Sequence, residues 1–140
     1  MIDCKLKVIE NKIIAKNIFS LTLEVPEMPE IKAGQFIMLE TPAAARLLRR
    51  PLGICAYDRT SITVCYQVAG KGTNALSEVK SGAFLNTLLP LGNGFPKEGK
   101  TIALVGGGVG IFPLLCYAQE NPEKNITSCL GFRNAECVCL

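Results

Sequence analysis

One stretch settles the fold class: Ile54-Cys55-Ala56-Tyr57-Asp58-Arg59-Thr60-Ser61-Ile62-Thr63-Val64-Cys65-Tyr66-Gln67-Val68. Its two ends, residues 54–57 and 61–68, are short runs rich in β-branched and aromatic residues. Such runs favour strands, and the polar triplet 58–60 between them favours a turn. The stretch therefore predicts a β-hairpin.

Similar patterns extend on both sides of this hairpin. Residues 5–25 alternate in runs at 5–9, 12–16 and 19–25 and predict two or three antiparallel strands, while 34–39 and 84–91 predict one strand each. Residues 73–80 predict a short helix, with the Thr73 hydroxyl as N-cap and Gly82 after its end. About six short strands with one helix indicate a small closed or sandwiched antiparallel β structure.

The pattern changes after the turn-rich residues 92–100. Residues 101–105 are almost wholly apolar, which predicts a strand buried on both faces, and five residues with four glycines follow before a helical segment at 111–120. With a further strand at 126–130, this is the beginning of a βαβ unit. We assign residues 1–98 to a β-domain and 99–140 to a partial α/β segment, because a doubly wound sheet normally has several more strands.

Composition excludes several functions. The 140 residues are 49% hydrophobic and carry a net charge of only +3, which does not favour nucleic-acid binding. The chain has no histidine, so Ser-His-Asp hydrolysis and histidine-ligated metals are excluded. An odd count of seven cysteines and a charged N-terminus predict a reduced, cytoplasmic protein, and no apolar run is long enough for a membrane helix. Cys137 and Cys139 are interpreted as packing residues, not metal ligands.

Three segments of the sequence have residues that favour binding of an anion. Arg49-Arg50-Pro51, preceded by Arg46, lies just before a predicted strand and favours a bidentate phosphate contact, or else a solvated basic loop. Gly70-Lys71-Gly72-Thr73 suits a phosphate or a simple N-cap. Gly106-Gly107-Gly108-Val109-Gly110 follows a strand and opens a helix, as in nucleotide sites, although it does not fit G-x-G-x-x-G and also suits a structural turn.

The order of these elements resembles the ferredoxin reductase superfamily. The chain is more closely similar to the electron transfer subunits of bacterial dihydroorotate dehydrogenase. The resemblance covers nearly the whole chain, and its most specific string is Gly92-Asn93-Gly94-Phe95-Pro96 after Leu89-Pro90-Leu91. It also includes Leu48-Arg49-Arg50-Pro51, Tyr66 before Gly70-Lys71-Gly72-Thr73, and the glycine cluster with Pro113-Leu114.

The resemblance implies a six-stranded antiparallel Greek-key barrel that binds FAD, then an NAD-binding α/β domain and a cysteine-rich tail with a [2Fe-2S] cluster. It implies the following cofactor-binding residues: Arg50, Pro51, Leu52 and Gly53 along the flavin; Cys65, Tyr66 and Gln67 at its edge; Gly70, Gly72 and Thr73 at its pyrophosphate; Gly106, Gly107, Gly108 and Gly110 at the nicotinamide nucleotide.

The chain departs from the family pattern at four places. Gly53 stands where a hydroxyl residue is usual, and Gln67 replaces an arginine, which loses a charge-assisted phosphate contact. Phe112 replaces a small residue or proline, and we expect it to crowd the nucleotide. The four cluster thiolates are absent, because Cys137-x-Cys139 does not match them.

By resemblance, the function is that of a flavin-dependent, NAD-linked oxidoreductase subunit in pyrimidine biosynthesis. Electrons would pass from a catalytic dihydroorotate dehydrogenase subunit through an iron-sulfur cluster and FAD to NAD. We expect no catalytic side chain and no metal ligand in this chain, and weak or absent NAD binding if the second domain is incomplete. The open edges of residues 126–130 favour a covering partner or a homo-oligomer. The alternatives are another ferredoxin or NAD(P)H reductase subunit and a degenerate, cofactor-free interaction module.

Overall fold

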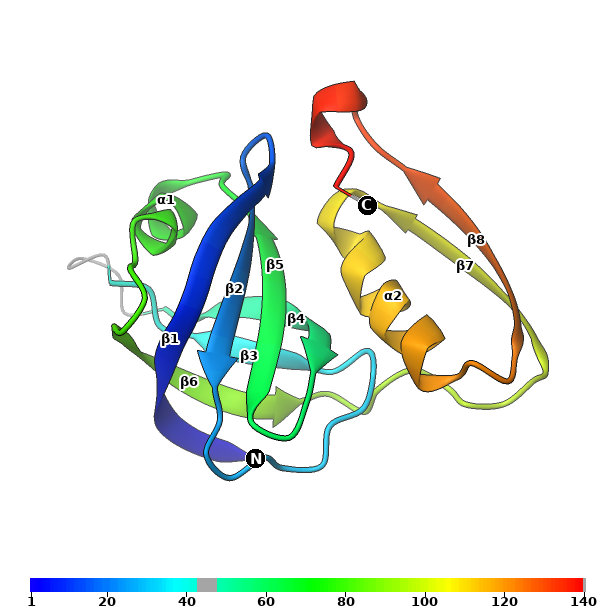
Figure 1. Ribbon diagram of the computed structural model, residues 1–140, viewed down its shortest axis with the longest axis horizontal. Coiled ribbons are helices and arrows are strands. Elements are labelled where there is room, and N and C mark those ends of the chain that lie inside the picture. Colours follow the sequence, from blue (N-terminus) through cyan, green and yellow to red (C-terminus); the bar gives the residue numbers. More distant parts are fainter. Residues whose placement is uncertain (43–47, 140) are drawn as a thin grey trace.

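A six-stranded antiparallel barrel forms the first part of the molecule (Figure 1). The computed structural model describes residues 1–42 and 48–139. The strands pair in the closed order β1-β2-β5-β4-β3-β6. Their bounds are Ile2–Ala15 for β1, Ile18–Glu24 for β2, Phe36–Leu39 for β3, Arg50–Tyr57 for β4, Ser61–Gln67 for β5 and Phe84–Leu91 for β6. The predicted barrel class, the hairpin of β4 and β5, and the bounds of β6 are confirmed.

β1 is one long strand, where the sequence pattern indicated two runs. Its first half pairs with β6, from Ile2 to Lys7, and its second half pairs with β2, from Lys7 to Ala15. A register shift between Val8 and Glu10 marks the place where the strand bends from one neighbour to the other. A bulge interrupts the side-chain alternation without ending the strand, so the pattern alone suggested a break.

The barrel interior is filled by side chains in alternate positions along its strands. They are joined by residues of α1, which spans Lys71–Ser77, and of the loop between β2 and β3. The buried cluster consists of Leu6, Val8, Leu21, Leu23, Val25, Ile31, Ile37, Leu39, Leu52, Ile54, Ile62, Val64, Tyr66, Leu76, Leu85 and Leu89. Closure leaves no free strand edge in the barrel, so this core is self-contained.

α1 begins two residues before the predicted helix. Gly70 is the N-cap in an extended conformation, and Thr73 is the third helical residue, not the cap. The Thr73 hydroxyl accepts hydrogen bonds from the Ala69 and Gly70 N–H groups at 3.0 and 3.2 Å. The hydroxyl therefore closes the loop that leads into the helix. Within residues 1–42 and 48–139, no helix is long and apolar enough to cross a membrane.

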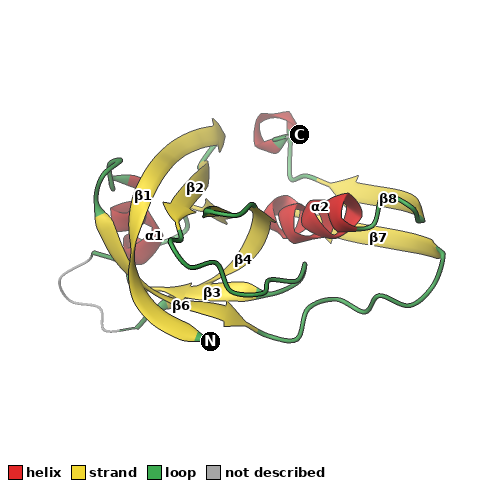
Figure 2. Ribbon diagram, turned by 60° about the horizontal axis from the view of Figure 1, so that its bottom comes forward, coloured by secondary structure: helices red, strands yellow, loops and turns green. Residues whose placement is uncertain are grey.

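The second part consists of β7 (Thr101–Gly107), α2 (Ile111–Glu120) and β8 (Asn125–Gly131). A 3₁₀ turn, Gly108–Gly110, joins β7 to α2, and β7 and β8 pair in parallel. Figures 1 and 2 show α2 between the barrel and this two-stranded sheet. The prediction that residues 101–105 are buried on both faces is wrong: Val105 is 76% exposed. α2 covers one face, and no second helix of the described chain covers the other.

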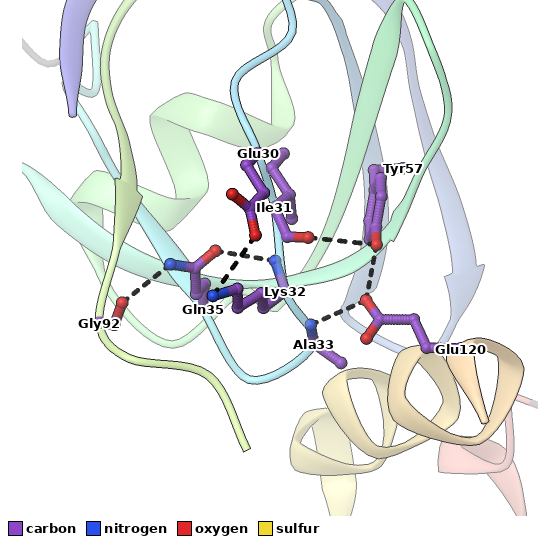
Figure 3. Close-up of polar contacts among 8 residues, drawn as sticks. All are labelled: Glu30, Ile31, Lys32, Ala33, Gln35, Tyr57, Gly92 and Glu120. Atoms are coloured by element: carbon purple, nitrogen blue, oxygen red, sulfur yellow. Dashed lines mark hydrogen bonds and ion pairs between the residues drawn. The ribbon is translucent and has the colours of Figure 1, made fainter. Parts of the chain in front are cut away.

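A polar cluster fastens the C-terminal end of α2 to the barrel (Figure 3). One carboxylate oxygen of Glu120 accepts hydrogen bonds from the Ala33 N–H at 2.8 Å and from the Tyr57 hydroxyl at 2.7 Å. Burial and the neighbouring Glu120 carboxylate raise the pKa of Tyr57 above its ordinary value, so the hydroxyl stays a donor. Gln35 bridges the same loop to β6 by donating to the Gly92 carbonyl at 2.8 Å.

Candidate functional site

A cavity of about 300 Å³ lies where the outer face of the barrel meets the start of α2. Its wall comes from β4, β5, the first turn of α1 and the turn before α2. The lining residues are Pro51, Leu52, Gly53, Cys55, Cys65, Tyr66, Gln67, Thr73, Val109, Gly110 and Pro113. Three segments that the sequence marked separately, 51–53, 65–67 and 109–113, are therefore brought together by the fold.

Strand alternation explains which side chains face this cavity. Ile54 and Val64 point into the barrel core and are fully buried there. Their neighbours Cys55 and Cys65 belong to a second buried cluster outside the barrel, with Ile111 of α2. Because successive residues of a strand point to opposite faces, the residues that build the barrel core also orient its neighbours toward α2.

Arg50 lies across the start of α1. A Cβ built on Gly72 would meet the Arg50 side-chain nitrogens Nε and Nη2 at 3.1 and 3.2 Å, so the absence of a side chain at Gly72 leaves room for the guanidinium. Arg50 also donates to the Leu48 carbonyl at 2.8 Å. Arg50 is the first residue of β4, not a residue before it, so its direction is set by the sheet. The Arg50 guanidinium thus lies against the glycine-rich backbone at the start of α1.

The other two arginines of this loop differ from Arg50. The Arg49 guanidinium donates to both carboxylate oxygens of Asp3 at 2.9 and 3.0 Å, so its charge is matched within the chain. Arg46 lies outside the described residues. The spacing of the three arginines did not separate them, whereas the resemblance named only Arg50, and the structure shows that Arg49 is paired with Asp3.

Gly53 and Pro113 are in close contact across the cavity mouth. A Cβ on Gly53 would lie 2.9 Å from Cγ of Pro113, which is closer than real Cβ atoms approach a neighbour. The absence of a side chain at Gly53 therefore allows α2 to pack against β4. Phe112 is 6% exposed and packs into the cluster with Ile18 and Cys55, and the expectation that it crowds the nucleotide stays a prediction.

The glycine cluster divides into residues with different roles. A Cβ on Gly106 would lie 2.7 Å from Cδ1 of Leu114, so Gly106 permits close packing of β7 on α2. Gly108 has a φ of +54°, which few other residues adopt readily. Gly110 borders the cavity, whereas Gly106, Gly107 and Gly108 do not. Only the last glycine of the cluster reaches the barrel-side site.

Tyr66 and Gln67 contribute differently to the wall. The Tyr66 ring is in the barrel core, stacks on Phe19 with ring centres 5.5 Å apart, and donates its hydroxyl to Asn11 Oδ1 at 3.0 Å. Burial raises the pKa of Tyr66 to about 12. Gln67 is exposed at the end of β5. Tyr66 therefore lines the cavity although its ring is buried in the barrel core, while Gln67 lines it with an exposed side chain.

Sequence reasoning missed three wall residues. Cys55 was interpreted as core packing, and Val109 and Pro113 were noted only as parts of motifs. Alternation along the hairpin does not reveal Cys55, because Cys55 is the extra residue of a bulge in β4. The contribution of Val109 and Pro113 depends on how α2 docks, for which the sequence carries no signal.

A second hollow of about 460 Å³ lies beside β7. Its lining is largely apolar and consists of Phe95, Pro96, Glu98, Ile102, Ala103, Leu104, Val105, Leu114 and Tyr117. It contains no basic side chain and one acidic one, which does not suit a phosphate-bearing ligand. The smaller cavity, with Arg50 and the α1 loop beside it, is the better candidate.

Comparisons with known proteins show what the chain is similar to. No protein-family model matches the chain. It is 41% identical to the dihydroorotate dehydrogenase B (NAD(+)) electron transfer subunit of Geobacillus sp. (strain WCH70), over 96% of this chain and 56% of that protein. The same subunit from Streptococcus mutans is 35% identical over 96% and 55%. The chain therefore spans about half the length of the curated relatives it matches, and the resemblance indicated by its motifs is confirmed.

Solved structures place the fold in the same group. Phthalate dioxygenase reductase, an electron-transfer protein between pyridine nucleotides and [2Fe-2S], matches with a TM-score of 0.87, 21% identity, and coverage of 98% of this chain and 46% of that one. An NADH-dependent reduced ferredoxin-NADP oxidoreductase matches with a TM-score of 0.85, 28% identity, and coverage of 96% and 51%. The ferredoxin reductase-like fold of the chain is thereby confirmed.

Proposed function

We propose that this chain, homologous over 96% of its length to dihydroorotate dehydrogenase B electron transfer subunits, binds FAD in the cavity between the barrel and α2. In this proposal the flavin relays electrons between an iron-sulfur, dihydroorotate-oxidising partner subunit and NAD. One observation carries the proposal: Arg50 lies over the side-chain-free Gly72 at the edge of an outward-facing cavity. From its similarity to electron transfer subunits we also propose that the chain works in the cytoplasm as one subunit of a larger assembly.

The residues present fit such a cofactor. The cavity volume of about 300 Å³ is at the lower end of ligand pockets and is sufficient for a planar ring system. Arg50 and the backbone N–H groups at the start of α1, around Gly72, would hold the negatively charged pyrophosphate. Thr73 keeps that loop in shape through its hydrogen bonds to Ala69 and Gly70.

The remaining wall residues would position the ring. Residues 51–53 of β4 and 65–67 of β5 form a continuous surface, and Pro113 with Val109 narrows its opening and limits water. When bound, the flavin supplies both one-electron and two-electron transfer. No side chain of this surface is required as an acid or a base. The protein contributes orientation, exclusion of water and the charge of Arg50.

The NAD side of the proposal rests on residues 106–110. Val109 and Gly110 are part of the cavity wall, so a nucleotide at this turn would approach the same cavity as the flavin. Gly106 and Gly108 serve packing and backbone conformation instead. We therefore propose that NAD binds more weakly than FAD to this chain.

The test is the visible absorption spectrum of the purified protein, followed by identification of any released flavin. We expect a yellow protein that releases FAD. For flavin-free protein, FAD at 100 times its dissociation constant should raise the free energy of unfolding by about 2.7 kcal/mol. A colourless protein whose thermal midpoint does not respond to FAD contradicts the proposal and favours the cofactor-free interaction module.

A matched pair of arginine variants locates the site. Arg50→Gln removes the charge at Gly72 and should weaken FAD binding by about 1.5–3 kcal/mol, or roughly tenfold or more. Arg49→Gln removes an equal charge that is already paired with Asp3, so FAD affinity should be almost unchanged. Isothermal titration with FAD measures both. Equal losses in the two variants would indicate a general electrostatic effect and not a site at Gly72.

A further inference from the structure

Two cysteines that the proposed function does not need as thiols lie together on the cavity wall. Cys55 on β4 and Cys65 on β5 both line it, and they are 5% and 8% exposed. Ile54 pairs with Val64 and Ala56 with Thr63, so Cys55 is the extra residue of a bulge. Both cysteines point away from the barrel core, into the cluster with Ile111. The hairpin thus presents a pair of thiols to one cavity.

The contacts show that the Cys55 sulfur lies against the Cys65 backbone. The Cys65 N–H donates to Cys55 Sγ at 3.1 Å, and the Cys55 thiol donates to the Gly53 carbonyl at 3.3 Å. Hydrogen bonding with Cys55 lowers the pKa of Cys65, whereas hydrogen bonding with Cys65 and burial raise the pKa of Cys55. Because the Gly53 carbonyl holds the Cys55 proton, we assign Cys65 as the nucleophile of the pair, since the thiolate is the reactive form.

We propose that Cys55 and Cys65 form a dithiol that hydrogen peroxide oxidises to a disulfide across the cavity wall. The Cys65 thiolate attacks one peroxide oxygen, so an S–O bond forms, the O–O bond breaks, and the leaving hydroxide takes a proton to become water. The Cys55 sulfur then attacks the Cys65 sulfur. The S–S bond forms, the S–O bond breaks, and the second hydroxide takes the Cys55 proton. Two thiols lose two electrons and one peroxide becomes two waters.

The cavity selects the oxidant by size. Both thiols are less than one tenth exposed and are reached through the cavity of about 300 Å³. Hydrogen peroxide has two heavy atoms and enters such a space, whereas a glutathione-sized disulfide must bring a sulfur of its own against Cys65 past Pro113 and Gly53. We therefore expect oxidation by peroxide and little reaction with oxidised glutathione.

Two other cysteines are alternative disulfide partners for Cys65. Cys137 and Cys139 pack against the cluster that contains Cys65, because the C-terminal segment returns to the barrel (Figure 1). The Lys16 N–H holds this segment through the Glu136 carbonyl at 3.1 Å. No group of three or more potential ligands among residues 1–42 and 48–139 is arranged to hold a metal ion. Pairing with Cys55 is favoured because its sulfur already contacts the Cys65 backbone.

The test counts and maps thiols in the purified, flavin-free chain. One equivalent of hydrogen peroxide should lower the free thiols of the denatured protein from seven to five, a loss of two, and peptide mapping should find the Cys55–Cys65 linkage. Cys129→Ser removes an exposed thiol and serves as the control, in which the same two thiols should be lost. Oxidised glutathione in place of peroxide should leave the count at seven.

Variants of the pair separate the two steps. Cys55→Ser should form no disulfide and should instead accumulate a Cys65 sulfenic acid that dimedone labels. Cys65→Ser should lose both reactions, and it carries the test if Cys55→Ser does not fold. A Cys65–Cys139 linkage, or oxidation of Cys129 before Cys65, overturns the proposal.

The expected effect of FAD on disulfide formation rests on the proposed function, whereas the disulfide itself does not. FAD at 100 times its dissociation constant leaves about 1% of the protein flavin-free, so it should slow disulfide formation up to ~100-fold if the ring covers Cys65. A chain that binds FAD but forms no disulfide overturns only this inference. A chain that forms the disulfide but does not bind FAD overturns only the proposed function.

Discussion

The barrel and the α/β part bury their residues in different ways. The barrel has sixteen buried core residues, and each of its strands is paired along both edges. The α/β part has its own buried cluster of Leu104, Cys116 and Tyr117, joined by Ala33 from the barrel side. β8 is exposed along almost its whole length. The first part therefore carries its own core, whereas the second depends on the barrel for much of its burial.

α2 is the element through which this dependence acts. Its first turn packs Ile111 and Phe112 against the outer barrel face, and its last residue, Glu120, accepts hydrogen bonds from the barrel. The candidate cavity lies at the first of these contacts. The proposed cofactor site thus lies at the junction, between the closed barrel and a helix that these contacts hold in place.

The largest test of this difference compares the same substitution in both parts. Val64→Ala opens space in the barrel core, where Val64 is fully buried, and should lower the free energy of unfolding by about 2–3 kcal/mol. Val105→Ala, on the exposed face of β7, should lower it by less than about 0.5 kcal/mol. Urea unfolding measures both. Equal losses would mean that the outer face of β7 is covered in solution.

A second test acts on the junction itself. Gly53→Ser restores a hydroxyl but places Cβ 2.9 Å from Pro113, so overpacking should lower the free energy of unfolding by about 1–3 kcal/mol. The double variant Gly53→Ser, Pro113→Ala should regain most of this loss. A double-mutant cycle by urea unfolding gives the coupling between the two positions. If the losses simply add, the contact is not the cause.

The polar anchor at the other end of α2 provides a third test. Glu120→Ala leaves the Ala33 N–H without its acceptor and the Tyr57 hydroxyl with only its longer bond, of 3.3 Å, to the Ile31 carbonyl, and should cost about 1–2 kcal/mol. Tyr57→Phe removes one of these bonds and should cost about 1 kcal/mol or less. Amide hydrogen exchange of α2 should rise in both variants while the barrel strands keep their protection. Faster exchange throughout the barrel would contradict the separation of the two parts.

The last test is a dependence on alkaline pH that resides in the barrel. Burial raises the pKa of Tyr66 to about 12, so the folded protein keeps this proton above the ordinary tyrosine pKa of about 10, at which the unfolded chain loses it. The stabilisation is complete below that pH and is lost as pH rises toward 12. Tyr66→Phe should flatten this decline of the free energy of unfolding between about pH 9 and about pH 11. An unchanged slope would assign the decline to other groups.

Much of the site was visible in the sequence as separate pieces. Residues 50–53 and 65–67 were predicted as cofactor contacts together with Gly70, Gly72 and Thr73. Seven of these residues line the cavity, and Arg50 lies against Gly72 beside it. The pairing of Gly53 with Pro113 was not visible, because it joins residues sixty positions apart. The same limit applied to Cys55, whose outward direction depends on a bulge in β4.

Local sequence patterns predict the hairpin, most of the strands and the helix at 111–120, because alternation, turn residues and glycines act over a few neighbouring positions. The pairing of Arg49 with Asp3, the contact of Arg50 with Gly72 and the contact of Cys55 with Cys65 were visible only in the folded chain. These contacts depend on strand register and on the docking of α2. Both are set by the packing of the whole chain, so local patterns do not encode them.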